Sequence, residues 1–135
     1  MDLVKSMFVS ASGMKAQTAR MKVISENLAN ANSTAKTADG DPYRRKTLSF
    51  KNEMDKTLGV ARVKVAGQGT DKSDFQLRYE PGHPGANADG YVKLPNVQAL
   101  IEVADMQEAQ RSYEANLSIV DAAKAMLSRT IDLLK

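Results

Sequence analysis

The single histidine of the chain, His83, is the side chain best suited to acid–base catalysis near neutral pH. It stands between Gly82 and Pro84, in a stretch rich in turn-forming residues. A catalytic histidine needs a positioned nucleophile or carboxylate within hydrogen-bond reach, and the surrounding sequence supplies no recognisable pair. We therefore expect His83 to have a structural role in a loop, and we expect no catalytic residue and no enzymatic activity.

Two short segments carry side chains of the kind that bind calcium: Asp39 and Asp41 in one, and Asn87 and Asp89 in the other. A calcium loop needs oxygen ligands at regular spacing and ends on a glutamate, and neither segment has that pattern. Turn formation explains both segments better, because Asp and Asn beside Gly favour turns. The chain also lacks cysteine, which excludes thiolate catalysis and cysteine-ligated metals. We expect no metal and no cofactor.

Phosphate binding has two candidate segments. Gly67–Gly69 is too short for a phosphate-binding loop, which needs a following helix and usually a Lys-Ser or Lys-Thr pair. The run Arg44–Lys46 is a single basic cluster, and the net charge of +3, from 19 basic and 16 acidic side chains, is a mild bias. We interpret the run as a solvated or subunit-facing basic turn, and we expect no nucleic-acid partner.

The elements that would carry these segments are predicted best at the two ends of the chain. Near the N-terminus, apolar residues share one helical face, most of them at steps of seven: Met7, Met14, Met21, Ile24 and Leu28. This spacing is typical of a helix that packs along another helix, and it predicts a helix over residues 3 to about 30. Gly13 weakens such a helix by about 1 kcal/mol relative to Ala. The helix therefore needs a packing partner.

A second repeat runs near the C-terminus in steps of three and four: Val103, Met106, Gln110, Tyr113, Leu117, Val120, Lys124, Leu127, Ile131 and Leu134. It predicts a helix over 97–133, with Asn96 as its N-cap. Such a helix is about 55 Å long. We infer that its apolar positions also pack against other subunits, and that Gln110 and Lys124 mark inter-subunit or channel-facing contacts.

The middle of the chain has the alternation of strands. Residues 61–65 and 75–79 alternate between apolar and polar side chains, and the segment 67–74 between them is a flexible, glycine-containing loop. This pattern predicts a β-hairpin. We expect residues 81–96 to be irregular, and 47–50 to form a short strand or an extended arm.

The predicted fold is therefore mainly α. Long N- and C-terminal helices form an antiparallel coiled-coil-like pair, and a small β-hairpin and irregular segments lie between them. The expected divisions are residues 1–32, 33–95 and 96–135. No apolar stretch approaches the roughly 18 residues that span a bilayer, and the N-terminus lacks the features of a secretory signal.

Three stretches resemble the axial (rod and hook) proteins of the bacterial flagellum, and most closely their FlgC-type proximal-rod subunits. They run from Ser25 to Arg45, from Tyr79 to Val97, and from Arg111 to Asn116 into the terminal repeat. The signature residues are Asn27, Leu28, Ala29, Asn30, Tyr43, Arg44, Pro81, His83, Pro84, Asp89, Gly90, Tyr91, Val92, Pro95, Asn96, Tyr113, Ala115 and Asn116. The first twenty residues and residues 51–74 depart from the family's pattern.

The resemblance implies a structural subunit of the proximal rod. Such a subunit is exported by the flagellar export apparatus without a cleaved signal. It assembles helically into the drive shaft that crosses the periplasm, transmits torque and encloses the export channel. Its implied partners are other copies of itself, other rod subunits, and the adaptor that joins the rod to the membrane ring.

Two other classes compete with this interpretation. A cytoplasmic coiled-coil adaptor that binds a helical partner would share the terminal repeats, but it would not need the stretch from His83 to Asn96. A weak nucleic-acid binder would rest on Arg44–Lys46 alone, and its binding would fall steeply with salt.

Overall fold

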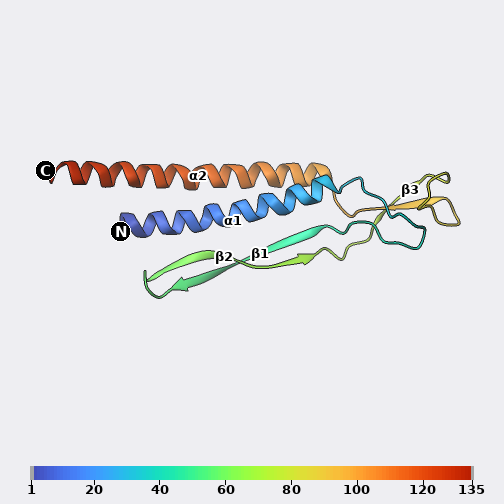
Figure 1. The fold of residues 1–135 in the computed structure, drawn as a ribbon, viewed down its shortest axis with the longest axis horizontal. Helices are drawn as coiled ribbons and strands as arrows, with labels where there is room; N and C mark the ends of the chain where they lie inside the picture. Colours follow the sequence, from blue (N-terminus) through green and yellow to red (C-terminus); the bar gives the residue numbers. More distant parts are fainter. Residues whose placement is uncertain (1, 135) are drawn as a thin grey trace. The chain divides into compact units, whose positions relative to one another are not determined.

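The computed structural model describes residues 2–134 and has a long helix at each end of the chain, with four strands between them in sequence (Figure 1). The elements are α1 (Leu3–Ala29), β1 (Lys46–Asp55), β2 (Val60–Thr70), β3 (Gln76–Tyr79), β4 (Tyr91–Leu94) and α2 (Ala99–Asp132). The two helices have 27 and 34 residues, so the mainly-α prediction holds.

The side chain of Asn30 caps the end of α1, whereas the start of α2 differs from the prediction. After Ala29 the chain turns, and the Asn30 side chain donates to the carbonyl of Glu26 at 2.8 Å, satisfying one of the last carbonyls of α1. The predicted N-cap of α2 is wrong. The helix begins at Ala99, and the side chain of Asn96 bonds to other segments instead.

The strand pairing differs from the prediction. β1 pairs with β2, and β3 pairs with β4 in an antiparallel register that sets Gln76 opposite Leu94 and Tyr79 opposite Tyr91. The predicted hairpin of 61–65 with 75–79 is therefore wrong, and residues 91–94, expected to be irregular, form a strand. Alternation identifies a strand but not its partner.

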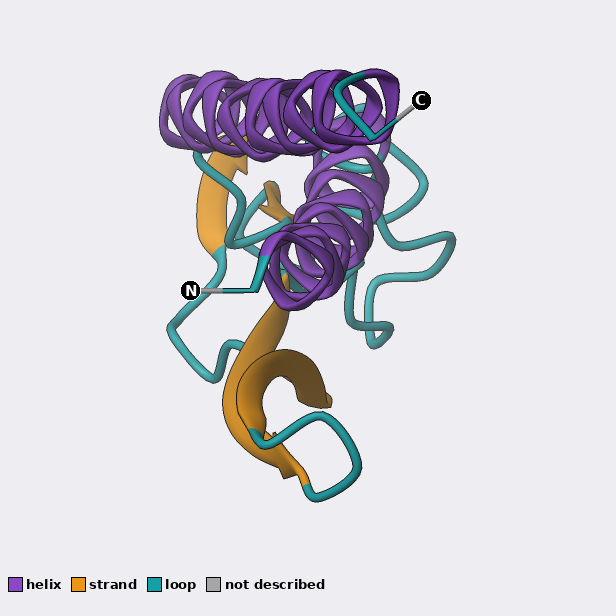
Figure 2. Cartoon of the chain, turned by 90° about the vertical axis from the view of Figure 1, so that its left-hand side faces the viewer, coloured by secondary structure: helices purple, strands orange, loops and turns teal. Residues whose placement is uncertain are grey.

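A short turn explains why β1 is the partner of β2. The carboxylate of Asp55 accepts the backbone N–H groups of Thr57 and Leu58, at 2.9 and 3.2 Å, and closes the connection within a few residues. A local hairpin costs less loop entropy than a longer connection. Figure 2 shows the strong twist of these strands, which is usual for a two-stranded ribbon.

The chain divides into two compact units. Unit 1 comprises Met1–Met21, Leu48–Gly67 and Met106–Lys135, and unit 2 comprises Lys22–Thr47 and Gln68–Asp105. Each unit thus contains a part of both helices.

In unit 1, a glycine on α1 allows close approach of α2. A Cβ atom at Gly13 would lie 2.9 Å from the side-chain nitrogen of Asn116, which itself donates to the carbonyl of Ser112. Further along, Arg20 pairs with Glu108 at 3.7 Å. The buried residues of this unit's helices are small: Ser10, Ala16, Ala109 and Ala123. The glycine that weakens α1 as an isolated helix is thus the residue that lets the helices touch.

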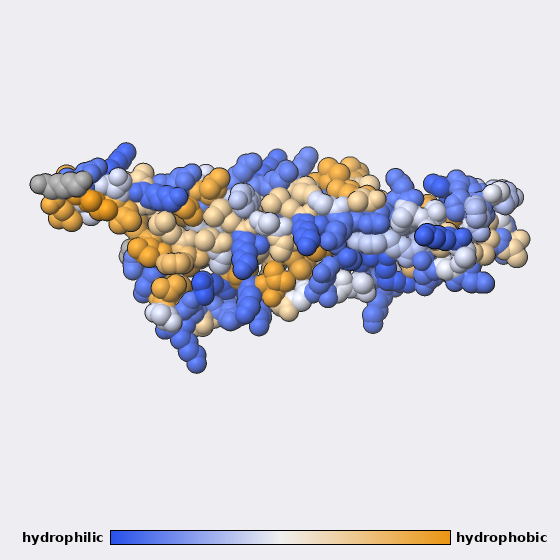
Figure 3. Space-filling model, in the orientation of Figure 1, coloured by the Kyte–Doolittle hydropathy of each residue, from blue (hydrophilic) through white to orange (hydrophobic). Residues whose placement is uncertain are grey.

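Large apolar side chains remain exposed in unit 1. Figure 3 shows apolar surface gathered over the C-terminal end of α2, at the left of the view. The exposed set on this part of α2 is Leu117, Ile119, Met126, Leu127 and Ile131, and Leu133 and Leu134, just after the helix, are also exposed. Within residues 2–134, no helix is both long and apolar enough to cross a membrane.

Unit 2 has a small apolar core made by its helix segments and β4. Val92 is fully buried, with Val23, Ile24 and Val97 also buried. Gly90, just before β4, has a φ of 83°. A Cβ atom there would lie 2.9 Å from the ring of Tyr79, so both conformation and space require glycine. This turn brings Tyr91 edge-on to Tyr79, with ring centroids 5.3 Å apart.

Candidate functional site: a buried polar network

Asn27, from α1, lies at the centre of a polar network in unit 2 and is 1% exposed. Its amide nitrogen donates to the carbonyl of Lys46 at 3.0 Å and to Glu102 Oε2 at 3.1 Å. Its oxygen accepts the backbone N–H of Lys46 at 2.9 Å and the hydroxyl of Tyr43 at 2.8 Å. An amide side chain has two N–H donors and two acceptor lone pairs, so Asn27 is fully satisfied.

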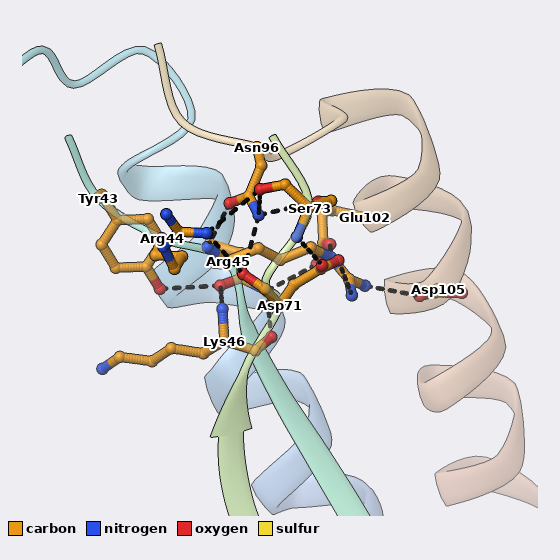
Figure 4. A network of polar contacts seen from close by, with 10 residues as sticks. Tyr43, Arg44, Arg45, Lys46, Asp71, Ser73, Asn96, Glu102 and Asp105 are labelled. Atoms are coloured by element: carbon orange, nitrogen blue, oxygen red, sulfur yellow. Dashed lines mark hydrogen bonds and ion pairs between the residues drawn. The ribbon is translucent and has the colours of Figure 1, made fainter. Parts of the chain in front are cut away.

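Glu102, from the first turn of α2, is buried to the same degree and faces Arg45 (Figure 4). Its second carboxylate oxygen accepts a charge-assisted hydrogen bond from Arg45 Nε. The other guanidinium nitrogens of Arg45 lie 3.8 Å from Asp71 and 3.9 Å from Asp105. A buried carboxylate is tolerated only when it is paired in this way, and one arginine here faces three carboxylates.

Asn96 connects the network to the segment after β2. Its oxygen accepts the backbone N–H of Arg45 at 2.7 Å. Its nitrogen donates to the carbonyl of Asp71 at 3.0 Å and to the carbonyl and hydroxyl oxygens of Ser73. The backbone N–H of Asp71 also donates to the carbonyl of Arg45 at 2.8 Å. Residues at and just before the start of β1 are therefore bonded by side chains from α1, from the segment before α2, and from the first turn of α2.

Four ionisable groups in or beside the network have shifted pKa values: Asp71, Glu26, Lys46 and Tyr43. Hydrogen bonds from the backbone and hydroxyl of Ser73 lower the pKa of Asp71. The hydrogen bond between Lys46 and Glu26, at 2.7 Å, lowers the pKa of Glu26 and raises that of Lys46. Burial raises the pKa of the Tyr43 hydroxyl. Each shift favours the protonation state that makes the observed contacts.

The two most buried polar side chains of the network make all their contacts inside it. Both carboxylate oxygens of Glu102 and all four bonding positions of Asn27 are engaged within unit 2. In the described part of the chain, no group of three or more His, Cys, Asp or Glu side chains could hold a metal ion. What the network does is join α1, the start of β1 and the start of α2.

The basic run differs from its interpretation as a solvated or subunit-facing turn. Arg45 faces the carboxylates, and Lys46 pairs with Glu26. Arg44 lies over the ring of Phe75, 4.2 Å from its centroid, and donates to the carbonyl of Ser73 at 3.2 Å. All three cations have partners within unit 2.

His83 has the loop role expected of it. Its Nδ1 accepts the backbone N–H of Gly85 at 2.9 Å, and its Nε2 lies 3.3 Å from the hydroxyl of Thr34. In the same loop, the side-chain oxygen of Asn87 accepts the backbone N–H groups of Asp89 and Tyr91. These bonds are turn-forming contacts, as predicted for Asn and Asp beside glycine.

The structure brings four of the signature residues into one network: Asn27, Tyr43, Arg44 and Asn96. Leu28, Ala29 and Asn30 complete the end of α1. Pro81, His83, Pro84, Asp89, Gly90, Tyr91, Val92 and Pro95 form the loop and strand that precede α2, and Val92 and Pro95 are buried. Tyr113, Ala115 and Asn116 lie in unit 1, and Asn116 contacts Gly13.

The predicted packing residues are mostly accessible. Ile24 is buried, and a further group is half-buried: Met7, Met14, Met21, Leu28, Met106, Tyr113 and Val120. Val103, Leu117, Leu127, Ile131 and Leu134 are exposed, from 38% at Leu127 to 83% at Leu134.

Sequence analysis did not select Arg45, Asp71 or Glu102. Charged residues are mostly exposed, so their types alone gave no reason to expect burial. One signal was present. Glu102 is the first member of a row at steps of seven whose other members are Ala109, Asn116 and Ala123. Glu102, Ala109 and Ala123 are buried, so this row of small residues, with one carboxylate, marks a buried stripe of α2.

Comparison with known proteins gives the chain's relatives. A family of flagella basal body rod proteins matches residues 7–35, and the C-terminal family of the flagellar basal body rod FlgEFG proteins matches residues 88–133. The flagellar basal-body rod protein FlgC of Agrobacterium fabrum is 50% identical over 127 residues, which cover 94% of this chain and 91% of the relative. The FlgC proteins of Bacillus subtilis (39% identical, all of both chains covered) and Salmonella typhimurium (38% identical, 98% of each chain covered) are also similar.

Proposed function

Since this chain belongs to the FlgC-type flagellar basal-body rod proteins and is a structural subunit of the rod, we propose that it assembles helically through its two terminal helices. The proposed assembly is the proximal part of the shaft that crosses the periplasm. It transmits torque and encloses the export channel.

The proposal treats α1 and α2 as an antiparallel, coiled-coil-like pair. In unit 1, the contacts of Gly13 with Asn116 and of Arg20 with Glu108 run in opposite directions along the two helices. In unit 2, Asn27 bonds Glu102. Close packing over small residues supports such a pair, because it lets two backbones approach. Close packing would also make the helix pair stiff, and a drive shaft requires stiffness.

The single observation that carries the assembly proposal is the exposed apolar seam of α2. Leu117, Leu127 and Ile131 are exposed although they belong to a regular apolar repeat. Exposed contiguous apolar surface on a small protein marks an interaction site. In a rod, neighbouring subunits would cover it, and Met7, Met14, Met21 and Leu28 would serve the same packing from α1.

The partners follow from this role. As a rod subunit, the chain assembles with other rod components. More finely, we propose contacts with other copies of itself, with the adaptor between the rod and the membrane ring, and with the flagellar export apparatus, which delivers it to the periplasm without a cleaved signal. Residues 1–32 and 96–135 form the axial core in this proposal, and residues 33–95 the middle segment. No catalytic activity is part of the proposed role.

The test is complementation of a motile bacterium that lacks its own FlgC. The chain should restore swimming and should be present in purified basal bodies. A cytoplasmic coiled-coil adaptor would instead be absent from basal bodies and would be recovered as a discrete soluble oligomer. Absence from basal bodies, with the chain expressed and intact in the cell, would refute the rod role.

A further inference from the structure

A groove of about 570 Å³ lies in unit 1 between α1 and the β1–β2 hairpin. Phe8 and Ala11 line it from α1, and Met54, Val63 and Val65 line it from the strands. The hairpin is held against α1 by a bond from the Val63 N–H to the Ser12 hydroxyl, at 3.3 Å. Phe8 and Met54 are nonetheless exposed, Met54 to 63%. The groove therefore has apolar side chains in its lining that stay exposed in the described part of unit 1.

Unit 1 also has an exposed apolar segment at the C-terminal end of α2. Two pairs show how the helices are aligned in unit 1: Gly13 lies beside Asn116, and Arg20 pairs with Glu108. Because one helix runs up as the other runs down, this alignment places Leu3, the first residue of α1, beside about residue 126 of α2. Residues 127–132 of α2 therefore extend past the start of α1. The exposed apolar residues are Leu127 and Ile131 in this segment, and Leu133 and Leu134 just after it.

We propose that the groove receives the C-terminal end of α2 from a second copy of the chain. An amphipathic helix in an apolar groove is a common mode of recognition. One pair of opposite charges is available to this contact. Exposed Lys15 lines the groove, and exposed Asp132 lies on the helix end between Ile131 and Leu133, where Arg129 is also exposed. The ion pairs Arg62–Asp55 and Lys64–Glu53 occupy the other charges of the rim.

The contact joins two different surfaces, so it is head-to-tail. Each bound pair keeps one empty groove and one uncovered helix end, and such contacts build an open helical assembly when the rotation between copies does not close a ring. The inference rests on the proposed function, because it supplies the contact through which copies add to a rod.

Disulfide crosslinking tests this contact, and the absence of native cysteine makes the background clean. Two single variants, tagged Met54→Cys and untagged Ile131→Cys, are produced together in cells that lack their own FlgC, and basal bodies are isolated under oxidising conditions. The matched control pairs tagged Leu77→Cys with Ile131→Cys. Leu77 is exposed to the same 63% as Met54 but lies on β3 in unit 2.

We expect a mixed dimer from Met54→Cys with Ile131→Cys at about ten times the control level, because a disulfide forms only where the Cα atoms lie within about 7 Å. A yield no higher than the control, or crosslinks only to a protein of different mass, would overturn the proposal. These outcomes differ from failure of the proposed function. In that case the unmodified chain itself would be missing from basal bodies.

Discussion

Asn27 donates a hydrogen bond to Glu102 across 75 positions of sequence, and the carboxylate that receives it is also bonded by Arg45. Both side chains are almost wholly buried. The pair joins the last turn of α1 to the first turn of α2 within unit 2, so polar residues there hold the two amphipathic helices together.

Replacing Asn27 with Ala should destabilise the chain strongly. The change leaves the buried oxygen of Glu102 and both backbone groups of Lys46 without a bond, at about 1–3 kcal/mol for each unsatisfied group. We expect a loss of about 3 kcal/mol in the free energy of unfolding, measured by urea denaturation followed by circular dichroism. Asn30→Ala is the control, since the Asn30 side chain donates one hydrogen bond, to the carbonyl of Glu26, and its loss should cost about 1 kcal/mol. Equal losses in both variants would show that the network is not the stabilising feature.

Replacing Gly13 with Ala should destabilise the chain although it improves helix propensity. Propensity alone would add up to about 1 kcal/mol, but the new Cβ atom would lie 2.9 Å from Asn116, and overpacking costs about 1–3 kcal/mol. We expect a net loss on thermal unfolding. Adding Asn116→Ala should recover much of it, and Gly67→Ala, where the space is open, should show no clash. If Gly13→Ala stabilises the chain, the helices do not approach here as described.

Leu117→Asp should separate assembly from folding. Leu117 is exposed in the single chain, so the unfolding free energy of the purified protein should change by less than about 1 kcal/mol. In a rod the same carboxylate would be buried without a partner, and motility in the complementation assay should be lost. Val120→Asp should also abolish motility. Ser118→Asp, at the neighbouring exposed position, should still swim. Swimming by the Leu117 variant would contradict the packing role of the seam.

Acid should weaken unit 2 through Asp71. Its pKa is lowered in the folded chain, so its contribution is complete above the ordinary Asp value of about 3.9 and is lost as the pH falls through the folded value. Asp71→Asn removes this titration. The difference in unfolding free energy between the wild type and this variant should therefore be smaller below about pH 4 than at about pH 6. Urea denaturation midpoints of both proteins, measured at each pH, give this difference. A difference that stays the same at low pH would exclude Asp71 as a source of acid sensitivity.

The repeats at the two ends predicted α1 and α2 because apolar spacing is a local property of the sequence. The strand pairing predicted for the middle of the chain was wrong for a different reason. Residues 61–65 and 75–79 are both strand segments, but a pattern of alternation does not say which strand lies beside which. The partner of β2 is β1, whose apolar residues Leu48, Phe50 and Met54 are diluted by charged neighbours.

The polar network was only partly accessible from the sequence. Asn27 and Tyr43 were selected only through the resemblance to rod proteins, and the chemistry of Asn96 was interpreted as that of an N-cap. Arg45 and Glu102 were missed because the burial of a charge is decided by distant partners, here separated by 57 positions. Gly13 was noticed as a local weakness, and its packing role depends on Asn116 from the other end of the chain.

The bonds that converge on Asn27 also set an order of events for a newly made chain. A ribosome releases Asn27 early, but Glu102 comes only after about three quarters of the residues have been joined. Contacts of such wide separation form late, because the intervening chain must first be closed into a loop. Unit 2 therefore cannot complete itself during most of synthesis. In the export route proposed above, that delay would keep the chain longer in the unfolded state that can pass through a narrow conduit.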